Sequence, residues 1–268
     1  MAKLKIVVLI GTPVYLNYFV NRIAEDHTLE LVIRENSRSN LIKKILKKGI
    51  LKSCFIILAH LANKKKTTKE YNRILGNKWT ALTVKTPLIT VENINSPQVK
   101  DQLEKIKPDL VVVQGTTMIK STTIKNIPLV LNLHWGLSPY YRGSYCTEWA
   151  ILNHDIYNIG YTIHKISSKI DGGAILTQGR PEIEAIDTSN SINMKLTKQG
   201  ADKMSEVITK IKDGEQPQFI KQETDKGKLY LIRNWTSKER KKLKYMESEG
   251  LLTQMSNNPK NCHKIIHW

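Results

Sequence analysis

The segment VLNLHWGLSPYYRG, residues 130–143, places an asparagine and a histidine at the end of an apolar run. Asn132 and His134 are two residues apart, so on an extended strand their side chains point to the same face. An amide N–H and an imidazole N–H that share one face can jointly stabilise an oxyanion. Asp171, in the segment SSKIDGGAIL, is the candidate carboxylate that would orient the imidazole and hold its charge. We therefore predict an oxyanion-stabilising site formed by these three residues.

Each of these residues also has a structural interpretation. A histidine at the end of a strand is more often structural than catalytic, and a lone asparagine there more often forms a turn. The combination with the glycine pair after Asp171 favours the catalytic interpretation. We interpret His154 and His164 as structural or substrate-adjacent, and Trp135 as either a substrate platform or a packed loop anchor.

The elements that must position this site alternate between strands and helices. Continuous apolar runs without alternation are typical of central parallel strands, and in such sheets ligands bind at the carboxyl ends of the strands. Gly115 and His134 both fall at such ends. The pattern predicts an α/β fold, a Rossmann-like, mostly parallel twisted sheet with right-handed crossovers. Strands are expected at residues 3–10, 29–33, 88–93, 110–115 and 129–134. Helices are expected at 14–24, 40–63 (cationic) and 97–107 (capped by Ser96), and a short helix or turn at 120–126.

The pattern changes after Gly143. A helix is expected at residues 146–152, and residues 161–166 and 173–184 resemble an antiparallel pair with alternating exposure. A long amphipathic helix follows at residues 187–212, with Gly214 just past its end. Residues 64–85 have no firm assignment, and the chain beyond residue 220 is basic and aromatic with weak periodicity.

The composition is that of a globular protein, with 268 residues, 40% hydrophobic and 25% charged. No apolar run approaches the roughly 20 residues that span a bilayer, and the N-terminal run lacks a cleavage site, so we expect a cytoplasmic protein without membrane insertion. Cys54, Cys146 and Cys262 form no pair with metal spacing, so no metal site is predicted. The net charge of +18 predicts attraction to nucleic acid, a membrane surface or a small polyanion, although it is equally consistent with a general compositional bias.

Taken together, the motifs resemble those of the formyltransferases that use 10-formyltetrahydrofolate. NLHWGLSPYYRG followed by IDGG resembles the two catalytic segments of that family, and PDLVVVQGTTMIKSTTIKNIP resembles its folate-cradling strand and loop. EWAILNHDIYNIGYTIHKI resembles the helix and strand between the catalytic segments. The resemblance covers residues 1–215, which it implies are the catalytic domain. Residues 216–268 would be a short C-terminal extension for dimerisation or substrate contact.

The resemblance implies direct attack of a primary amine on the formyl carbon of 10-formyltetrahydrofolate, the co-substrate. Asn132 and His134 would stabilise the oxyanion, while Asp171 would keep His134 charged and help to move the proton of the amine. It also implies residues that contact each substrate. Those for the folate are Gly115, Thr117, Met118, Ile119, Lys120, Ile170 and Gly172, and those for the acceptor are Trp135, Tyr140, Tyr141, Arg142 and Gly143.

Three branches of the family differ in their acceptor. The segment GTPVYLNYF lacks the phosphate loop of the glycinamide ribonucleotide branch, and residues 214–268 are too short for the C-terminal barrel of the methionyl-tRNA branch. The branch acting on nucleotide-linked amino sugars for surface polysaccharides fits best, and it implies a homodimer and a diphosphate-linked acceptor. Arg34, Arg38 and Arg142 are candidate ligands of this acceptor, and a solvated surface role fits Arg34 and Arg38 equally well. A methionyl-tRNA formyltransferase-like enzyme, or a non-catalytic RNA-binding member, remains the alternative because of the basic segment SKERKKLKYM.

Overall fold

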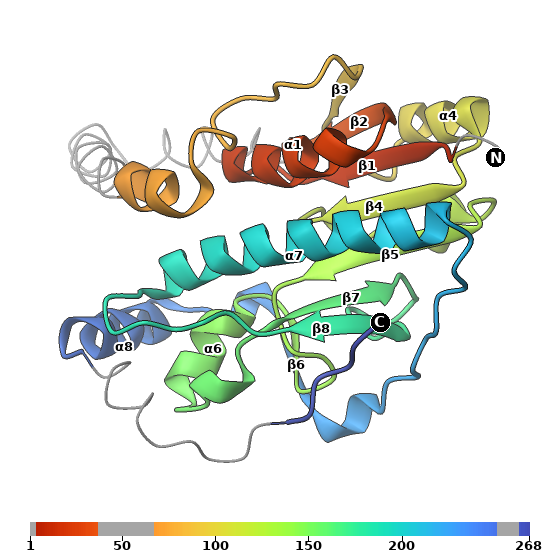
Figure 1. The fold of residues 1–268 in the computed structure, drawn as a ribbon. Helices are drawn as coiled ribbons and strands as arrows, with labels where there is room; N and C mark the ends of the chain where they lie inside the picture. Colours follow the sequence, from red (N-terminus) through yellow and green to blue (C-terminus); the bar gives the residue numbers. More distant parts are fainter. Residues whose placement is uncertain (1–3, 37–66, 251–262) are drawn as a thin grey trace, which may run out of the picture.

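A computed structural model describes residues 4–36, 67–250 and 263–268, and it contains the predicted mixed sheet (Figure 1). The sheet has seven strands in the order β3-β2-β1-β4-β5-β7-β8. The first five in this order pair in parallel, and β7 and β8 join antiparallel. The strands are β1 Ile6–Ile10, β2 Leu29–Glu35, β3 Leu88–Val91, β4 Leu110–Gln114, β5 Leu129–His134, β7 Tyr161–Lys165 and β8 Ile175–Gly179.

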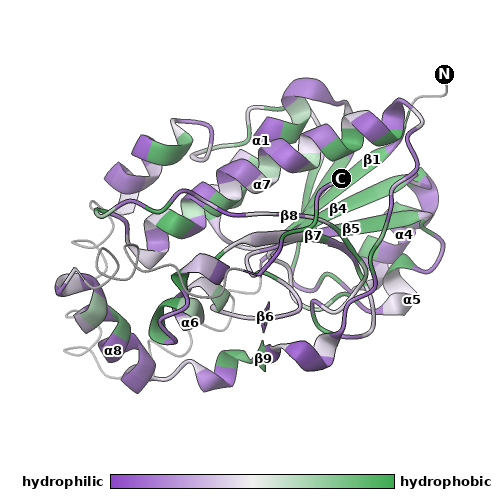
Figure 2. Ribbon diagram, turned by 60° about the horizontal axis from the view of Figure 1, so that its bottom comes forward, coloured by the Kyte–Doolittle hydropathy of each residue, from purple (hydrophilic) through white to green (hydrophobic). Residues whose placement is uncertain are grey.

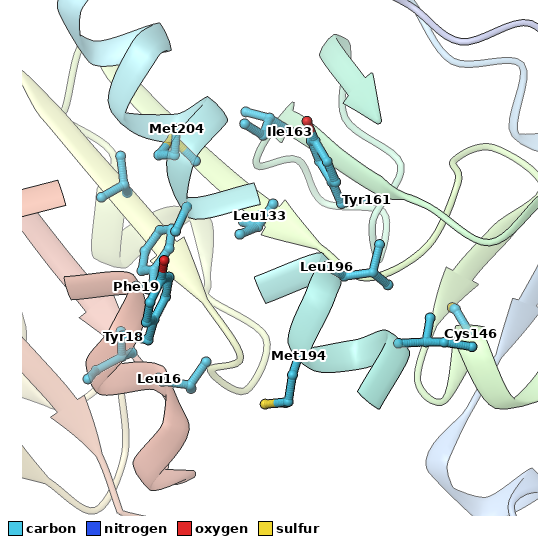
Figure 3. Packing of buried hydrophobic residues seen from close by; sticks show 14 of the residues in the cluster. Leu16, Tyr18, Phe19, Leu133, Cys146, Tyr161, Ile163, Met194, Leu196 and Met204 are labelled. Carbon is cyan, nitrogen blue, oxygen red and sulfur yellow. The ribbon is translucent and has the colours of Figure 1, made fainter. Parts of the chain in front are cut away.

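Helices cover both faces of the sheet, which explains why the central strands are apolar on both sides. One face packs against α1, Asn17–Asp26, and α7, Ser189–Lys212. The other packs against α4, Pro97–Ile106, and the short α5, Ser121–Ile124. The apolar sheet lies between polar outer helix faces in Figure 2, and Figure 3 shows Phe19, Met204 and Leu133 meeting in the core between α1, α7 and β5.

The long helix α7 confirms the amphipathic pattern, although it begins two residues later than predicted. Thr188 is its N-cap, and its side chain accepts a hydrogen bond from the backbone N–H of Ser191. Gly214, just past the helix, has φ of +93°, a conformation that glycine adopts without steric cost. The capping prediction for α4 is only partly right, because Ser96 occupies the N-cap position without a side-chain capping hydrogen bond.

The predicted alternating exposure of the antiparallel pair is wrong. In β7, Tyr161 to His164 are all buried and Lys165 alone is exposed. The reason is that the loop after β5 covers the second face of this strand. Thr162 there accepts a hydrogen bond from the N–H of Ser138 and donates one to the carbonyl of Gly136. A polar side chain on this face is therefore satisfied by the loop and not by solvent.

Two further helices were not predicted, and the cationic segment 40–63 lies outside the described residues. Residues 67–75 form a helix within the segment that had no assignment. The basic segment forms α8, Ser237–Ser248, begun by a capping box between Thr236 and Glu239. The short helix α6, Cys146–Leu152, agrees with the prediction. Among the described residues, no helix is both long and apolar enough to cross a membrane.

The C-terminal extension is built into the fold through a second, two-stranded sheet. β6, Tyr141–Gly143, pairs in parallel with β9, Lys228–Tyr230. Next to it, Trp149 of α6 stacks on Tyr230, and Trp235 stacks on Tyr145. Residues 263–268 lie along β8, where the carbonyl of Ile266 accepts a hydrogen bond from the N–H of Gln178.

Candidate active site

The structure brings Asn132, His134 and Asp171 together at the carboxyl end of β5. Asn132 and His134 share the face of β5 that also carries Val130, which packs in the core on the α4 side. Asp171 reaches them from the loop between β7 and β8. Its Oδ2 lies 3.4 Å from Nδ1 of His134, and its Oδ1 accepts a hydrogen bond from Nδ2 of Asn132 at 3.4 Å. The geometry thus agrees with the predicted grouping, while the catalytic roles stay predictions.

His134 has an oxygen atom beside each ring nitrogen. Nε2 lies 3.0 Å from the carbonyl oxygen of Tyr141, opposite the side that faces Asp171. The thiol of Cys146 lies 3.7 Å from the same Nε2. Since a neutral imidazole carries one N–H, only the imidazolium donates to both oxygens. To donate a hydrogen bond to an oxyanion through Nε2, His134 has to give up its contact with the carbonyl oxygen of Tyr141.

Gly136 permits the loop to close over the imidazole. A Cβ atom at this position would lie 2.3 Å from Nε2 of His134 and 2.4 Å from the carbonyl oxygen of Tyr141. Both distances are far below ordinary van der Waals contact, so a side chain would push the loop off the histidine. This explains the glycine that follows the His-Trp pair in the sequence.

Asp171 is ionised and held by several donors. Burial alone would raise the pKa of this carboxyl, but the charges of His134 and His164 and the N–H of Gly143 together lower it well below its ordinary value. The N–H of Gly143 donates to Oδ2 at 3.0 Å. Burial lowers the pKa of His134, and the Asp171 carboxylate opposes that effect. A fixed negative charge therefore stands beside a buried imidazole.

His164 is a member of this cluster that the sequence did not reveal as such. Its Nε2 lies 3.1 Å from Nδ2 of Asn132 and 3.5 Å from Oδ1 of Asp171, while Nδ1 lies 2.8 Å from the carbonyl oxygen of Lys165. Nε2 thus faces both the amide of Asn132 and the carboxylate of Asp171. The pairing register explains the proximity, because Asn132 is directly opposite His164 in the antiparallel pair of β5 and β7. Only the pairing register of β5 and β7 would have revealed that His164 belongs to the cluster, and the periodicity of the sequence does not give this register.

The loop predicted to cradle the folate, residues 115–120, follows β4 beside this cluster. Gly115 begins it with φ of +70°. The buried carboxylate of Glu35 fixes it, accepting from the N–H of Thr117 at 2.6 Å and from its hydroxyl at 2.7 Å. Lys120 is tied through its N–H to Asn95 at 2.7 Å. Met118 is 58% exposed and free to contact a ligand, whereas Ile119 is buried in the core.

The remaining predicted folate contacts flank Asp171. Ile170 is 37% exposed, and Gly172 is half-buried. These two residues and the exposed part of the 115–120 loop are compatible with a ligand beside the cluster. The contact predicted for Ile119 could involve only its backbone.

The predicted acceptor-binding residues divide into two groups. The side chains of Tyr141 and Arg142 are buried and bonded within the protein, which argues against direct contact with a substrate. The hydroxyl of Tyr141 donates to Asp155 at 2.7 Å, and the guanidinium of Arg142 donates to the carbonyls of Pro139 at 3.3 Å and Thr224 at 2.8 Å. Gly143 contributes its N–H to Asp171.

Tyr140 and Trp135 form the second group, and both stack on other rings. Tyr140 stacks on His263 with ring centroids 3.4 Å apart, and Trp135 stacks on Tyr15 at 5.6 Å. Both are only partly buried. Arg34 is tied to Asn17 by a hydrogen bond, and burial lowers its pKa. Arg38 lies outside the described residues.

The groups of the cluster can support acid–base and electrostatic chemistry, whereas the nearby thiol is poorly suited to act as a nucleophile. Cys146 is 3% exposed, and burial raises the pKa of its thiol well above the ordinary value. Cys54 and Cys262 fall outside the described ranges. Within those ranges, no three histidine, cysteine or carboxylate side chains gather as metal ligands would.

Comparison with known proteins supports this interpretation of the fold and identifies the family. The family model described as formyl transferase matches residues 31–208, and the chain therefore belongs to the formyl transferase family. The bifunctional polymyxin resistance protein ArnA of Wigglesworthia glossinidia brevipalpis is 39% identical over 114 residues, 42% of this chain and 17% of that protein. The methionyl-tRNA formyltransferase of Methylacidiphilum infernorum is 33% identical over 130 residues, 48% of this chain and 40% of that protein. The chain thus spans less than half of either relative.

Solved structures share the fold at low identity. A 4-N formyltransferase from Francisella tularensis superposes with a TM-score of 0.57 and 17% identity, covering 92% of this chain and 88% of that one. The N-formyltransferase from Helicobacter canadensis, solved with folinic acid and dTDP-3-aminofucose, gives 0.56 and 18%, covering 87% and 72%. The fold class expected from the sequence is confirmed.

Proposed function

We propose that the chain transfers a formyl group from 10-formyltetrahydrofolate to the primary amine of a nucleotide-linked amino sugar. The observation that carries this proposal is the cluster of Asn132, His134 and Asp171 at the carboxyl end of β5. The family of the chain supports the formyl transfer, and the structural relative that was solved with folinic acid and dTDP-3-aminofucose supports the two substrates.

The residues support attack by an amine on the formyl carbon. A new C–N bond forms, and the negative charge that develops on the formyl oxygen is stabilised by the amide of Asn132 and the positive charge of His134. Asp171 accepts the proton that the attacking nitrogen loses, directly or through water. The proton then passes to the folate nitrogen as its bond to the formyl carbon breaks. The products are an N-formyl sugar and tetrahydrofolate.

The two candidate functions differ in the molecule that accepts the formyl group. A nucleotide-linked sugar is a small dianion, which suits a chain with a net charge of +18. The competing acceptor is an aminoacyl-tRNA, which is favoured by the sequence relative from Methylacidiphilum infernorum and by α8. On α8 the exposed cations are Lys238, Arg240, Lys241, Lys242 and Lys244.

The experiment is a transfer assay with both acceptor classes. The protein is mixed with 10-formyltetrahydrofolate and dTDP-, UDP- or GDP-linked 3-amino or 4-amino sugars, and products are identified by mass spectrometry. A parallel reaction contains methionyl-tRNA. We expect a formylated sugar and no formylated tRNA.

Formyl-methionyl-tRNA without any formylated sugar would overturn the choice of acceptor. Absence of product with every acceptor, together with tRNA binding whose affinity falls steeply with salt, would favour a non-catalytic RNA-binding protein. The expected homodimer, in which the extension takes part, is tested separately by sedimentation.

A further inference from the structure

The backbone of Asp171 adopts a conformation that its neighbours must enforce. Its φ is +44°, in the left-handed region that side chains other than glycine rarely occupy. Residues in such conformations persist only where surrounding contacts determine them. The contacts of the carboxylate fix its two oxygens, but they do not fix the backbone on either side.

One side chain, that of Gln222, connects two backbone carbonyls of this loop. Nε2 of Gln222 donates to the carbonyl of Asp171 at 3.1 Å and to the carbonyl of Gly173 at 2.5 Å. The hydroxyl of Ser138 adds a longer contact to the carbonyl of Asp171, at 3.4 Å. Gln222 is 8% exposed, so its two hydrogen bonds are shielded from water.

Gln222 is itself anchored on both sides. On its N-terminal side, Ile220 exchanges two backbone hydrogen bonds of 2.8 Å with Ile175 of β8. On its C-terminal side, the carbonyl of Thr224 accepts from Arg142, and the N–H of Lys228 donates to the carbonyl of Tyr140 at 2.9 Å. The segment therefore leads from β8 past Asp171 to β6, and Figure 1 shows this part of the chain passing from the end of α7 toward β6.

The same segment also places the N–H that holds the carboxylate. β9 pairs with β6, and the carbonyl of Tyr230 accepts from the N–H of Ser144 at 2.8 Å. Gly143, within β6, donates to Oδ2 of Asp171. Backbone and carboxylate of Asp171 are thus held through one stretch of chain, residues 220–230, which lies beyond residues 31–208 of the family match.

We propose that Gln222 is a positioning residue that holds Asp171 against His134, so that the C-terminal extension completes the active site. This inference rests on the proposed function for its kinetic consequence. Its structural content is that loss of the Gln222 hydrogen bonds moves the Asp171 carboxylate away from the imidazole.

Two variants remove these bonds with little change in volume. Gln222→Met lacks both donors, and Gln222→Glu keeps the shape but turns an acceptor toward two carbonyl oxygens. Gln218→Met, at an exposed glutamine just before this segment, is the matched control. We expect kcat for formyl transfer to fall about 10- to 100-fold in both Gln222 variants, because displacement of a reacting group by about 1 Å can cost 10²-fold. KM for each substrate should change by less than about twofold, and the control should match the natural protein.

A second readout needs no substrate. His134 is faced by Asp171, by His164 of β7, by Arg142 of β6 and by the thiol of Cys146. Since Asp171 provides the negative charge among these groups, its displacement disfavours protonation of His134. In ¹⁵N-histidine NMR spectra recorded between pH 5 and pH 8, we expect a smaller protonated fraction of His134 in Gln222→Met, which adds no charge, than in the natural protein. The resonance is assigned by its absence in a His134→Asn variant.

The kinetic and NMR measurements together separate the positioning role of Gln222 from the proposed formyl transfer. Equal protonated fractions, or full kcat in Gln222→Glu, would overturn the positioning role. If no acceptor is formylated by the natural protein while the NMR difference is present, the proposed function fails and the positioning of Asp171 stands. Variants that unfold are recognised by circular dichroism, and Gln222→Glu, which preserves the shape, then serves in place of Gln222→Met in the kinetic assay.

Discussion

At the scale of single residues, the site depends on one carboxylate that several hydrogen-bond donors and imidazoles surround. Asp171 faces His134 and His164 and accepts from Asn132 and Gly143. The imidazole of His134 therefore lies between the Asp171 carboxylate and the Tyr141 carbonyl. The Asp171 carboxylate offsets part of the effect of burial, although the pKa of His134 stays below its ordinary value.

Replacement of Asp171 by asparagine tests this arrangement. The substituted amide could still accept from the Gly143 N–H, but it would carry no charge and accept no proton. We expect kcat to fall by about 10²- to 10⁴-fold, the range typical of a lost general acid–base group. The measurement is steady-state formyl transfer with the acceptor that the transfer assay identifies.

The matched control is Asp225→Asn, at an exposed aspartate of the C-terminal segment, which should retain full activity. Full activity of Asp171→Asn in a folded protein would remove the proton-handling role of this residue.

At the scale of elements, each loop of the site is held by a distant partner. The 115–120 loop depends on Glu35 at the end of β2, which also accepts from the N–H of Ile94 at 3.1 Å. A carboxylate can serve donors at both oxygens, whereas an amide offers one oxygen and would turn its NH₂ group toward another N–H.

Glu35→Gln should therefore loosen the loop. We expect KM for 10-formyltetrahydrofolate to rise about tenfold with a smaller change in kcat, and the free energy of unfolding to fall by about 1–3 kcal/mol, the cost of an unsatisfied buried group. Initial-rate kinetics and urea unfolding measure the two effects. Glu92→Gln, at an exposed residue just after β3, is the control, and an equal rise of KM in the control would contradict the assignment.

The junction of α6, α7 and α8 predicts a pH dependence of stability. Burial raises the pKa of Glu148 from 4.5 to about 7, although Asn193 donates to this carboxylate at 3.0 Å. Because the folded-state pKa is raised, the contribution of Glu148 to stability is fully present below pH 4.5 and is lost as the pH rises to about 7.

Glu148→Gln keeps the hydrogen bond from Asn193 and removes the titration. Above pH 7 we expect the variant to be more stable than the natural protein by up to about 3 kcal/mol, with the difference vanishing below pH 4.5. Urea unfolding at several pH values checks this. Glu104→Gln, at an exposed residue of α4, should show no such crossover, and a constant difference across the pH range in Glu148→Gln would refute the assignment.

At the scale of the whole molecule, aromatic packing joins the C-terminal extension, residues 216–268, to the preceding part of the chain. Trp235 is 6% exposed, stacks on Tyr145 at 5.0 Å and meets Trp149 edge-on at 5.5 Å. We expect Trp235→Ala to lower the free energy of unfolding by about 3–5 kcal/mol, as for other buried large aromatics. Trp268→Ala, which removes a ring that contacts Lys210, should cost about 1 kcal/mol.

Urea unfolding followed by circular dichroism distinguishes the two tryptophan variants. Equal losses in both would mean that the stack around Trp235 does not anchor the extension. A loss of formyl transfer in Trp235→Ala under conditions where it remains folded would further link β9 to the site.

The sequence was sufficient for the sheet and for the grouping of Asn132, His134 and Asp171, because apolar runs and strand ends are local signals. It was insufficient for His164, the N–H of Gly143 and Gln222. Their contacts with the site depend on the antiparallel register of β5 and β7 and on the pairing of β6 with β9, which are long-range. The loop motif likewise carries no information about the inward orientation of the Tyr141 and Arg142 side chains.

The segments that lie along β8 have a consequence for the behaviour of the protein in concentrated solution. Unpaired backbone groups on a terminal strand invite pairing with another molecule. Here Ile220 and Ile266 occupy hydrogen-bonding positions on β8, at Ile175 and Gln178. Displacement of residues 263–268 would open part of this strand to a neighbouring sheet. A bulky fusion attached after Trp268 is therefore expected to promote aggregation more than the same fusion placed before Met1.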